Sequence, residues 1–285
     1  MCNSSTGRIE RRSPSVSVPS VQLYSIRDAM AADLDAAVAR VAELGLTRVE
    51  PYAFAQRTAD LKRALSANGL TAPSGHASVI DAADPDAVFD AAEELGIGLV
   101  IDPFVPTERW RTADDAALLA DAVNGLSARA AERGLRFGYH NHQWEFANQV
   151  GGRPVYELFV ERLDPGVALQ VDAFWAAVGG ADAPAVLRGL GDRVAAIHVK
   201  DGRLTGDIAT VLPSSESALI VPEALKAAYE NQTPAGQGDL DVGAVLAAAP
   251  HALRVIEFDS YAGDVFEGIA QSLAWLAEHD TEGAA

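Results

Sequence analysis

The sequence predicts a single (β/α)8 barrel, or TIM barrel, from three observations. The chain has 285 residues, which suits one barrel of about 250 residues with a short tail. From residue 20 to about residue 279, short β-like runs alternate with helical patterns, and no change in composition marks a domain boundary. No Gly-rich phosphate loop follows the first strand, as a doubly wound sheet would favour. We therefore expect a flexible tail over residues 1–19 and one barrel over residues 20–280.

Eight short runs rich in apolar residues are the predicted strands. Their number favours closure into a barrel over a doubly wound open sheet, which more often has about five to seven strands. In chain order the predicted strands are residues 20–26, 47–51, 71–76, 98–103, 135–140, 167–172, 194–200 and 254–259.

Between the strands, apolar residues recur at spacings of three and four, which predicts helices. These segments include residues 33–44, 60–68, 84–95, 114–133, 154–162, 241–249 and 264–278. Glycines follow four of them, at positions where a helix C-cap takes left-handed φ: Gly45, Gly69, Gly96 and Gly134. A longer stretch, residues 203–237, follows the seventh strand, and we expect this insertion to overhang the barrel mouth.

Composition argues against several classes of protein. No apolar run approaches the roughly 20 residues that span a bilayer, so no membrane association is expected. The net charge of −18 would repel a phosphate backbone, so we expect no nucleic-acid partner. The first 20 residues lack the apolar segment of a secretory signal. Cys2 is the only cysteine, which excludes an internal disulfide and a thiolate metal cage. We therefore expect a cytoplasmic protein.

Polar residues end the last four predicted strands, where barrels of this kind place their active sites. Because strand side chains alternate, Asp172, His198 and Glu257 are expected to face inward. A buried, unpaired carboxylate would be costly, which favours a bound cation. Glu145, beyond the fifth strand, is the expected fourth ligand, and His140 is the competing ligand from the same segment. Such a set suits one divalent ion, Mn²⁺ first, with Mg²⁺, Co²⁺ or Zn²⁺ as alternatives.

Other residues near the expected mouth are predicted to contact the substrate. His76 ends the third strand and suits a substrate contact or a core position better than metal ligation. Trp175 fits stacking against a sugar ring, and Arg27 could bind one anionic group. No Gly-rich or Arg-clustered anion site is evident, so the sequence does not support phosphate recognition. The predicted substrate-binding set is Tyr24, Arg27, His76, His140 and Trp175.

The most specific motifs are residues 22–27, 139–142 with Glu145, 171–172, 197–201, 236–239 and 256–257. Through them residues 20–279 resemble the sugar phosphate isomerase/epimerase superfamily, the xylose isomerase-like TIM barrels. The resemblance implies one metal held by Glu, Asp, His and Glu, and Asp172, His198 and Glu257 match three of these positions. Ketose epimerases carry Glu where His140 stands here, so either Glu145 or His140 is the fourth ligand. A His-rich fifth strand resembles the dehydratase-like and keto-glycoside-cleaving branches.

The predicted function is that of a divalent-metal-dependent isomerase or epimerase, acting on a sugar or keto-sugar through an enediolate intermediate. His142 is the first choice of base, Glu145 and Glu257 are alternatives, and Lys200 is a candidate acid or oxyanion partner. Loss of a β-substituent from the same intermediate would make the protein a lyase instead, either a dehydratase or a keto-glycoside-cleaving enzyme. A non-catalytic sugar-binding barrel is the alternative outside enzymes. The sequence leaves open a homo-oligomer or a partner subunit.

Overall fold

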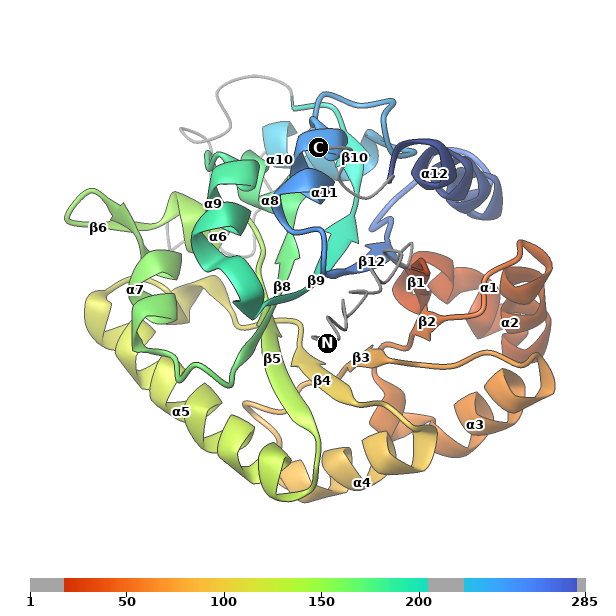
Figure 1. The fold of residues 1–285 in the computed structure, drawn as a ribbon, viewed down its shortest axis with the longest axis horizontal. Coiled ribbons are helices and arrows are strands. Elements are labelled where there is room, and N and C mark those ends of the chain that lie inside the picture. Colours follow the sequence, from red (N-terminus) through yellow and green to blue (C-terminus); the bar gives the residue numbers. More distant parts are fainter. Residues whose placement is uncertain (1–17, 205–222, 281–285) are drawn as a thin grey trace, which may run out of the picture.

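The computed structural model describes residues 18–204 and 223–280 of the chain. Within them, eight parallel strands form one sheet in the order β2-β1-β12-β9-β8-β5-β4-β3. Parallel bridges from Arg48 to Thr71 and from Tyr52 to His76 link the two outermost strands of this order, β2 and β3. The strands lie at the centre of the molecule and most of the helices surround them (Figure 1). The predicted (β/α)8 barrel is therefore confirmed.

The eight barrel strands begin and end within the predicted ranges, except that the last begins one residue earlier. They are β1 (Ser20–Gln22), β2 (Val49–Glu50), β3 (Ser74–His76), β4 (Leu99–Asp102), β5 (Arg136–His140), β8 (Ala168–Asp172), β9 (Val194–Val199) and β12 (Leu253–Ile256). The first strand is shorter than predicted because the side chain of Gln22 accepts a hydrogen bond from the backbone N–H of Tyr24. The chain there turns into a 3-10 helix, η1 (Leu23–Ile26).

All seven predicted helices are present: α2 (Leu34–Glu43), α3 (Thr58–Ala67), α4 (Pro85–Leu95), α5 (Ala113–Glu132), α7 (Val155–Arg162), α11 (Val242–Ala248) and α12 (Val265–His279). Five further helices were not among those predicted: α1 (Arg27–Ala32), α6 (Trp144–Ala147), α8 (Ala173–Val178), α9 (Ala183–Leu190) and α10 (Glu223–Glu230). They are too short for periodicity to reveal, because that pattern needs a window of about 11 residues. Three more 3-10 turns are η2 (Phe54–Gln56), η3 (Thr107–Arg109) and η4 (Gly191–Arg193).

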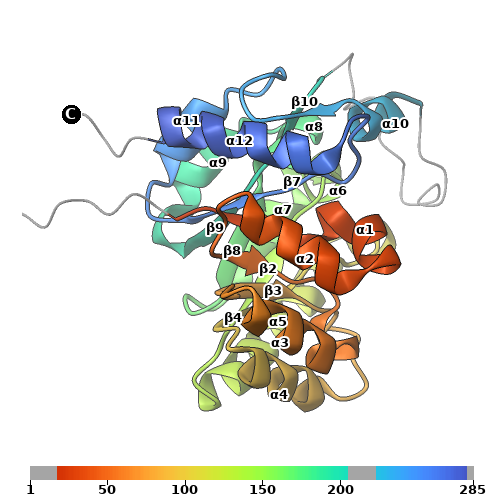
Figure 2. The ribbon, with the colours of Figure 1, turned by 90° about the vertical axis from the view of Figure 1, so that its right-hand side faces the viewer.

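Local sequence explains where the outer helices start and stop. The carboxylates of Asp33, Asp84 and Asp241 accept backbone N–H groups in the first turns of α2, α4 and α11. The glycines that follow α2, α3, α4 and α5 have φ angles of 88°, 64°, 71° and 74°, as predicted for helix stops. Helices α2, α3 and α4 lie side by side along one flank of the barrel (Figure 2). Repeated caps therefore produce the repeated βα unit.

The insertion after β9 is described only at its two ends, because residues 205–222 lie outside the described part of the chain. Strands β10 (Asp201–Gly202) and β11 (Gln232–Thr233) pair antiparallel. The buried carboxylate of Asp201 accepts the backbone N–H groups of Gly236, Gly238 and Leu240, which holds the end of the insertion against β10. Leu225, Lys226 and Tyr229 of α10 line the cavity at the barrel mouth. The overhang is confirmed for this part.

A second antiparallel pair, β6 (Gln149–Val150) with β7 (Arg153–Pro154), lies outside the barrel sheet. The predicted tail, residues 1–19, is described only from residue 18 onward. None of the described helices combines the length and the hydropathy that a membrane span requires.

The register of the strands sets polar side chains side by side within the barrel. Gln22 pairs with Glu50, and Asp172 pairs with His198. His140 pairs with the residue at position 170, a glutamine. Because neighbouring positions in parallel strands face the same way, these residues form adjoining layers inside the barrel. The register therefore brings the inward polar residues of separate strands together.

Candidate active site

A cavity of about 1010 Å³ opens beyond the carboxyl ends of the barrel strands. His76 at the end of β3, His140 at the end of β5 and Glu257 just beyond β12 form part of its lining. The backbone N–H of Glu257 still bonds to the carbonyl of Val199, so this residue continues the line of its strand. The cavity therefore lies where barrels of this architecture carry function.

Asp172, His198 and Glu257 meet at the inner end of this cavity. One ligand atom from each lies within 4.8 Å of the others, and all three side chains are buried. Nδ1 of His198 is 2.6 Å from Oε2 of Glu257 and 3.9 Å from Oδ2 of Asp172. The structure thus brings together three of the four residues predicted as ligands. Two carboxylates and an imidazole are donors suited to a divalent ion.

Lys200 places an ammonium group among these carboxylates. Its Nζ is 2.8 Å from Oδ2 of Asp172, 2.8 Å from Oε2 of Glu257 and 2.6 Å from Oδ2 of Asp259. Burial alone would lower the pKa of Lys200, but the three carboxylates raise it well above its usual value. The two oxygens predicted to hold a metal therefore already face positive charge.

Glu50, at the end of β2, orients His198 from behind. Its side chain is fully buried, and its Oε1 lies 2.9 Å from Nε2 of His198. Gln22, Ser74 and Gln170 also donate hydrogen bonds to the Glu50 carboxylate. Burial alone would raise the pKa of Glu50, but the histidines beside it lower it well below its usual range. A carboxylate behind an imidazole is the usual support of a metal-bound histidine.

This pairing shows that the residues present fit a divalent ion. Burial alone would lower the pKa of His198, but Glu257 and Glu50 raise it to about 10. With one nitrogen of His198 held by Glu50, the other is aimed at Glu257 and Asp172. Sequence reasoning missed Glu50. The signal was available, since Glu50 closes a short predicted strand as Asp172 does.

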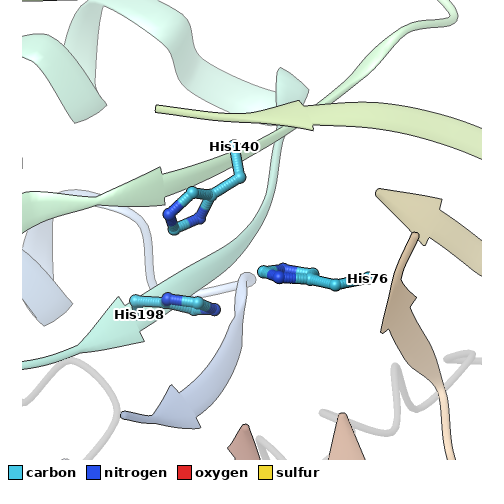
Figure 3. A group of neighbouring side chains, drawn as sticks. All are labelled: His76, His140 and His198. Carbon is cyan, nitrogen blue, oxygen red and sulfur yellow. The ribbon is translucent and has the colours of Figure 1, made fainter. Parts of the chain in front are cut away.

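Three histidines, His76, His140 and His198, gather beside the carboxylates (Figure 3). Their ring centroids are 5.3 Å apart for His76 and His140, 4.5 Å for His140 and His198, and 5.4 Å for His76 and His198. Oε1 of Gln170 lies 2.6 Å from Nε2 of His76 and 3.0 Å from Nδ1 of His140. Glu50 and Gln170 thus already satisfy the facing nitrogens, so the carboxylate-rich group is the better cation site. Burial lowers the pKa of His140 well below its usual value.

The structure does not bring Glu145 to this cluster. Its fully buried carboxylate accepts the hydroxyl of Tyr139 at 2.8 Å and the backbone N–H of His142 at 2.9 Å. Tyr139 lies on the outer face of β5 and packs against Trp110 and Phe159. Because side chains alternate along a strand, the inward position belongs to His140 instead. The assignment of Glu145 as fourth ligand therefore needs correction in favour of His140.

His142 lines the cavity beside two aromatic side chains. Its ring stacks on Trp144 with centroids 4.4 Å apart and meets Phe104 edge to face at 5.8 Å. Burial lowers the pKa of His142 to about 4. The expectation that this imidazole titrates near neutral pH is therefore wrong, because the enclosed site disfavours its charged form. At neutral pH the ring is an uncharged proton acceptor.

Of the remaining predicted substrate contacts, Tyr24 and Trp175 line the cavity. Arg27 does not, since its guanidinium donates to the backbone carbonyls of Tyr24 at 3.0 Å and Asp259 at 2.8 Å. The indole N–H of Trp175 bonds to the Asp259 carboxylate at 3.0 Å. Asp259 was not singled out from the sequence, yet it connects Lys200, Trp175 and the insertion through Gln232. Arg27 is a structural residue here.

A (β/α)8 barrel with carboxylates and histidines at its carboxyl-terminal mouth defines a class of protein with a site suited to a metal ion. The chain belongs to the xylose isomerase-like TIM barrel family, whose sequence model matches residues 38–279. The resemblance inferred from the motifs is confirmed. No curated protein gives a significant match to the sequence.

Solved structures share the fold at low identity. A sugar phosphate isomerase/epimerase from Parabacteroides distasonis has a TM-score of 0.72 and 20% identity, covering 92% of this chain and 94% of its own. The probable 3-DHS dehydratase AsbF from Bacillus anthracis has a TM-score of 0.67 and 12% identity, covering 91% and 98%. A xylose isomerase-like TIM barrel protein from Mycobacterium smegmatis in complex with magnesium has a TM-score of 0.64 and 16% identity, covering 95% and 98%.

Proposed function

We propose that this protein is a divalent-metal-dependent isomerase or epimerase that acts on a sugar or keto-sugar. The observation that carries the proposal is the convergence of Asp172, His198 and Glu257 at the inner end of the cavity. Glu50 behind His198 supports it, because a core histidine without a ligand would not need a nitrogen aimed at two carboxylates. The family and its solved relatives favour sugar chemistry.

Asp172, His198 and Glu257 would hold the ion, with His140 as the fourth candidate. When bound, the ion would polarise a substrate carbonyl and stabilise negative charge that develops on its oxygen. Mn²⁺ is the first expectation, with Mg²⁺, Co²⁺ and Zn²⁺ as alternatives for the same donor set. Lys200 would then turn toward Asp259, which already accepts its shortest contact of 2.6 Å.

His142 is the proposed base. Its neutral ring lines the cavity, where it can take a proton from the carbon next to the substrate carbonyl. A weakly basic imidazole also returns the proton readily, as an isomerase or epimerase requires. Lys200, held by carboxylates at the inner end, is the proposed hydrogen-bond donor to the oxygen that gains charge. Glu257 is the alternative base, since its carboxylate also lines the cavity.

A lyase is the second candidate function. Loss of a β-substituent after the same proton removal would give a dehydration or the cleavage of a keto-glycoside. The fold similarity to a probable dehydratase favours this candidate. Both candidates share the first step, so they differ only in where the electron pair leaves.

The test is solvent exchange in D₂O with added Mn²⁺ and a panel of ketoses and keto-glycosides. A competent substrate should gain deuterium at the carbon next to its carbonyl, and the released products separate isomerase from lyase. Protein purified without chelator should contain about one metal ion per chain by elemental analysis. A protein that binds sugars but neither retains metal nor exchanges protons would instead be a non-catalytic sugar-binding barrel.

A further inference from the structure

The cavity is larger than the proposed chemistry at one sugar ring needs. Its volume of about 1010 Å³ reaches the upper end of the roughly 300–1,000 Å³ found for sites that enclose drug-sized ligands. The carboxylate cluster occupies only the inner end. The lining also includes six aromatic side chains: Tyr24, Tyr52, Phe104, Trp144, Trp175 and Tyr229. The outer part therefore has room and walls for a second group on the substrate.

Phe104 is the most informative of these side chains. It is 50% exposed, one of three large exposed hydrophobic residues in the described part of the chain. Its ring meets Trp144 edge to face at 5.4 Å and His142 at 5.8 Å, so it stands at a fixed angle over the proposed base. Tyr24 and Tyr52 form another edge-to-face pair at 5.3 Å in the same lining. Ordered rings left open to solvent in a cavity favour an apolar, planar ligand.

The charge of the lining disfavours a phosphorylated substrate. Within the described residues, Lys226 is the one Lys or Arg that lines the cavity, and its ammonium is 3.8 Å from Glu230. Three carboxylates, those of Glu108, Glu257 and Asp259, line the same cavity. Phosphate sites depend on clustered cations or helix N-termini, and this wall carries the opposite charge. The substrate is therefore expected to be uncharged.

We propose that the substrate is a neutral glycoside with an aromatic aglycone, whose ring lies against Phe104 and Trp144 in the outer part of the cavity. The position of its sugar at the carboxylate cluster rests on the proposed function, whereas the aglycone contact rests on the aromatic walls alone. A second sugar ring is a poorer occupant, because Ala53, Ala77 and Pro103 beside the rings offer its hydroxyls no side-chain partner.

The test is calorimetric binding to the full chain, with and without Mn²⁺, of four probes: 4-nitrophenyl β-D-glucopyranoside, cellobiose, D-glucose and D-glucose 6-phosphate. The nitrophenyl glucoside should bind at least about threefold more tightly than any other probe. Phe104→Ala should weaken that probe by about three- to tenfold, the value of one aromatic contact, and leave glucose unchanged. Leu118→Ala is the matched control, since Leu118 is 69% exposed and lies on α5 away from the cavity lining.

Tighter binding of the phosphate or of cellobiose, or an unchanged nitrophenyl glucoside affinity in Phe104→Ala, would overturn the proposal. Failure of the metal site is a separate result. The Phe104 effect needs no ion, so it should persist in chelator-treated protein and in Asp172→Asn. If it persists there while Mn²⁺ fails to bind the unaltered protein, the aglycone contact stands and the metal-dependent function does not.

Discussion

Glu257 and Glu145 are both buried glutamates near the barrel mouth, but their surroundings are opposite. Glu257 faces inward and contacts His198 and Lys200, and these groups lower its pKa well below the usual value although burial alone would raise it. Glu145 has only the Tyr139 hydroxyl and backbone N–H groups as partners, and burial raises its pKa to about 8. The face of the barrel wall that a carboxylate occupies therefore determines whether it meets cations.

The inner cluster should show the largest effect. Asp172→Asn removes a carboxylate that contacts Lys200 and lies near His198. We expect Mn²⁺ affinity to fall by more than about 100-fold, beyond the roughly 10–100-fold that loss of a ligand's hydrogen-bond partner costs. Titration of metal-free protein with Mn²⁺ measures this. Glu145→Gln is the matched control and should bind the ion normally. If Glu145→Gln loses the metal and Asp172→Asn retains it, the comparison is reversed.

His142→Ala tests the base on the other side of the cavity. It should slow deuterium uptake by on the order of a hundredfold, the contribution expected from general base catalysis, while metal content stays intact. Exchange is followed by NMR of the substrate. Product formed without solvent deuterium would point to hydride transfer between carbons, and His142 would lose its role. The corresponding Glu257 variant would lose exchange and metal together.

Glu50→Gln probes the support of the cluster. It keeps the side chain's shape but weakens the bond to Nε2 of His198, so we expect metal affinity to fall by roughly 10–100-fold. A merely structural role would lower the unfolding temperature without changing the affinity of the folded protein. Metal titration and thermal unfolding of the same samples separate these outcomes.

The smallest effect concerns the outer glutamate and the pH dependence of stability. Because the pKa of Glu145 is raised from 4.5 to about 8 on folding, its neutral form stabilises the folded state below about pH 4.5. That contribution declines as pH rises to about 8 and is lost above it, because the unfolded carboxyl ionises first. Glu145→Gln should therefore flatten the fall in unfolding free energy between pH 5 and pH 8, measured by urea denaturation. An unchanged slope would mean that Glu145 is ionised in the folded protein.

Much of the fold was predictable because its signals are local. Helix periodicity, Asp caps and the glycines at positions 45, 69, 96 and 134 each act within a few residues. The same holds for the polar ends of the strands, which identified Asp172, His198 and Glu257. Helices α8 and α9 were missed because each is too short to show a period.

The assignments that needed tertiary structure were those that depend on direction or on distant partners. The sequence by itself determined a barrel of eight βα units and three inward polar strand ends, because caps and side-chain alternation are properties of short segments. Only the closed barrel decided that Glu50, from the second strand, supports His198, and that Glu145 turns outward to Tyr139. The same closure gave Arg27 two carbonyl partners and lowered the pKa of His142. Burial and long-range contacts arise when all the strands meet, and no local pattern carries that information.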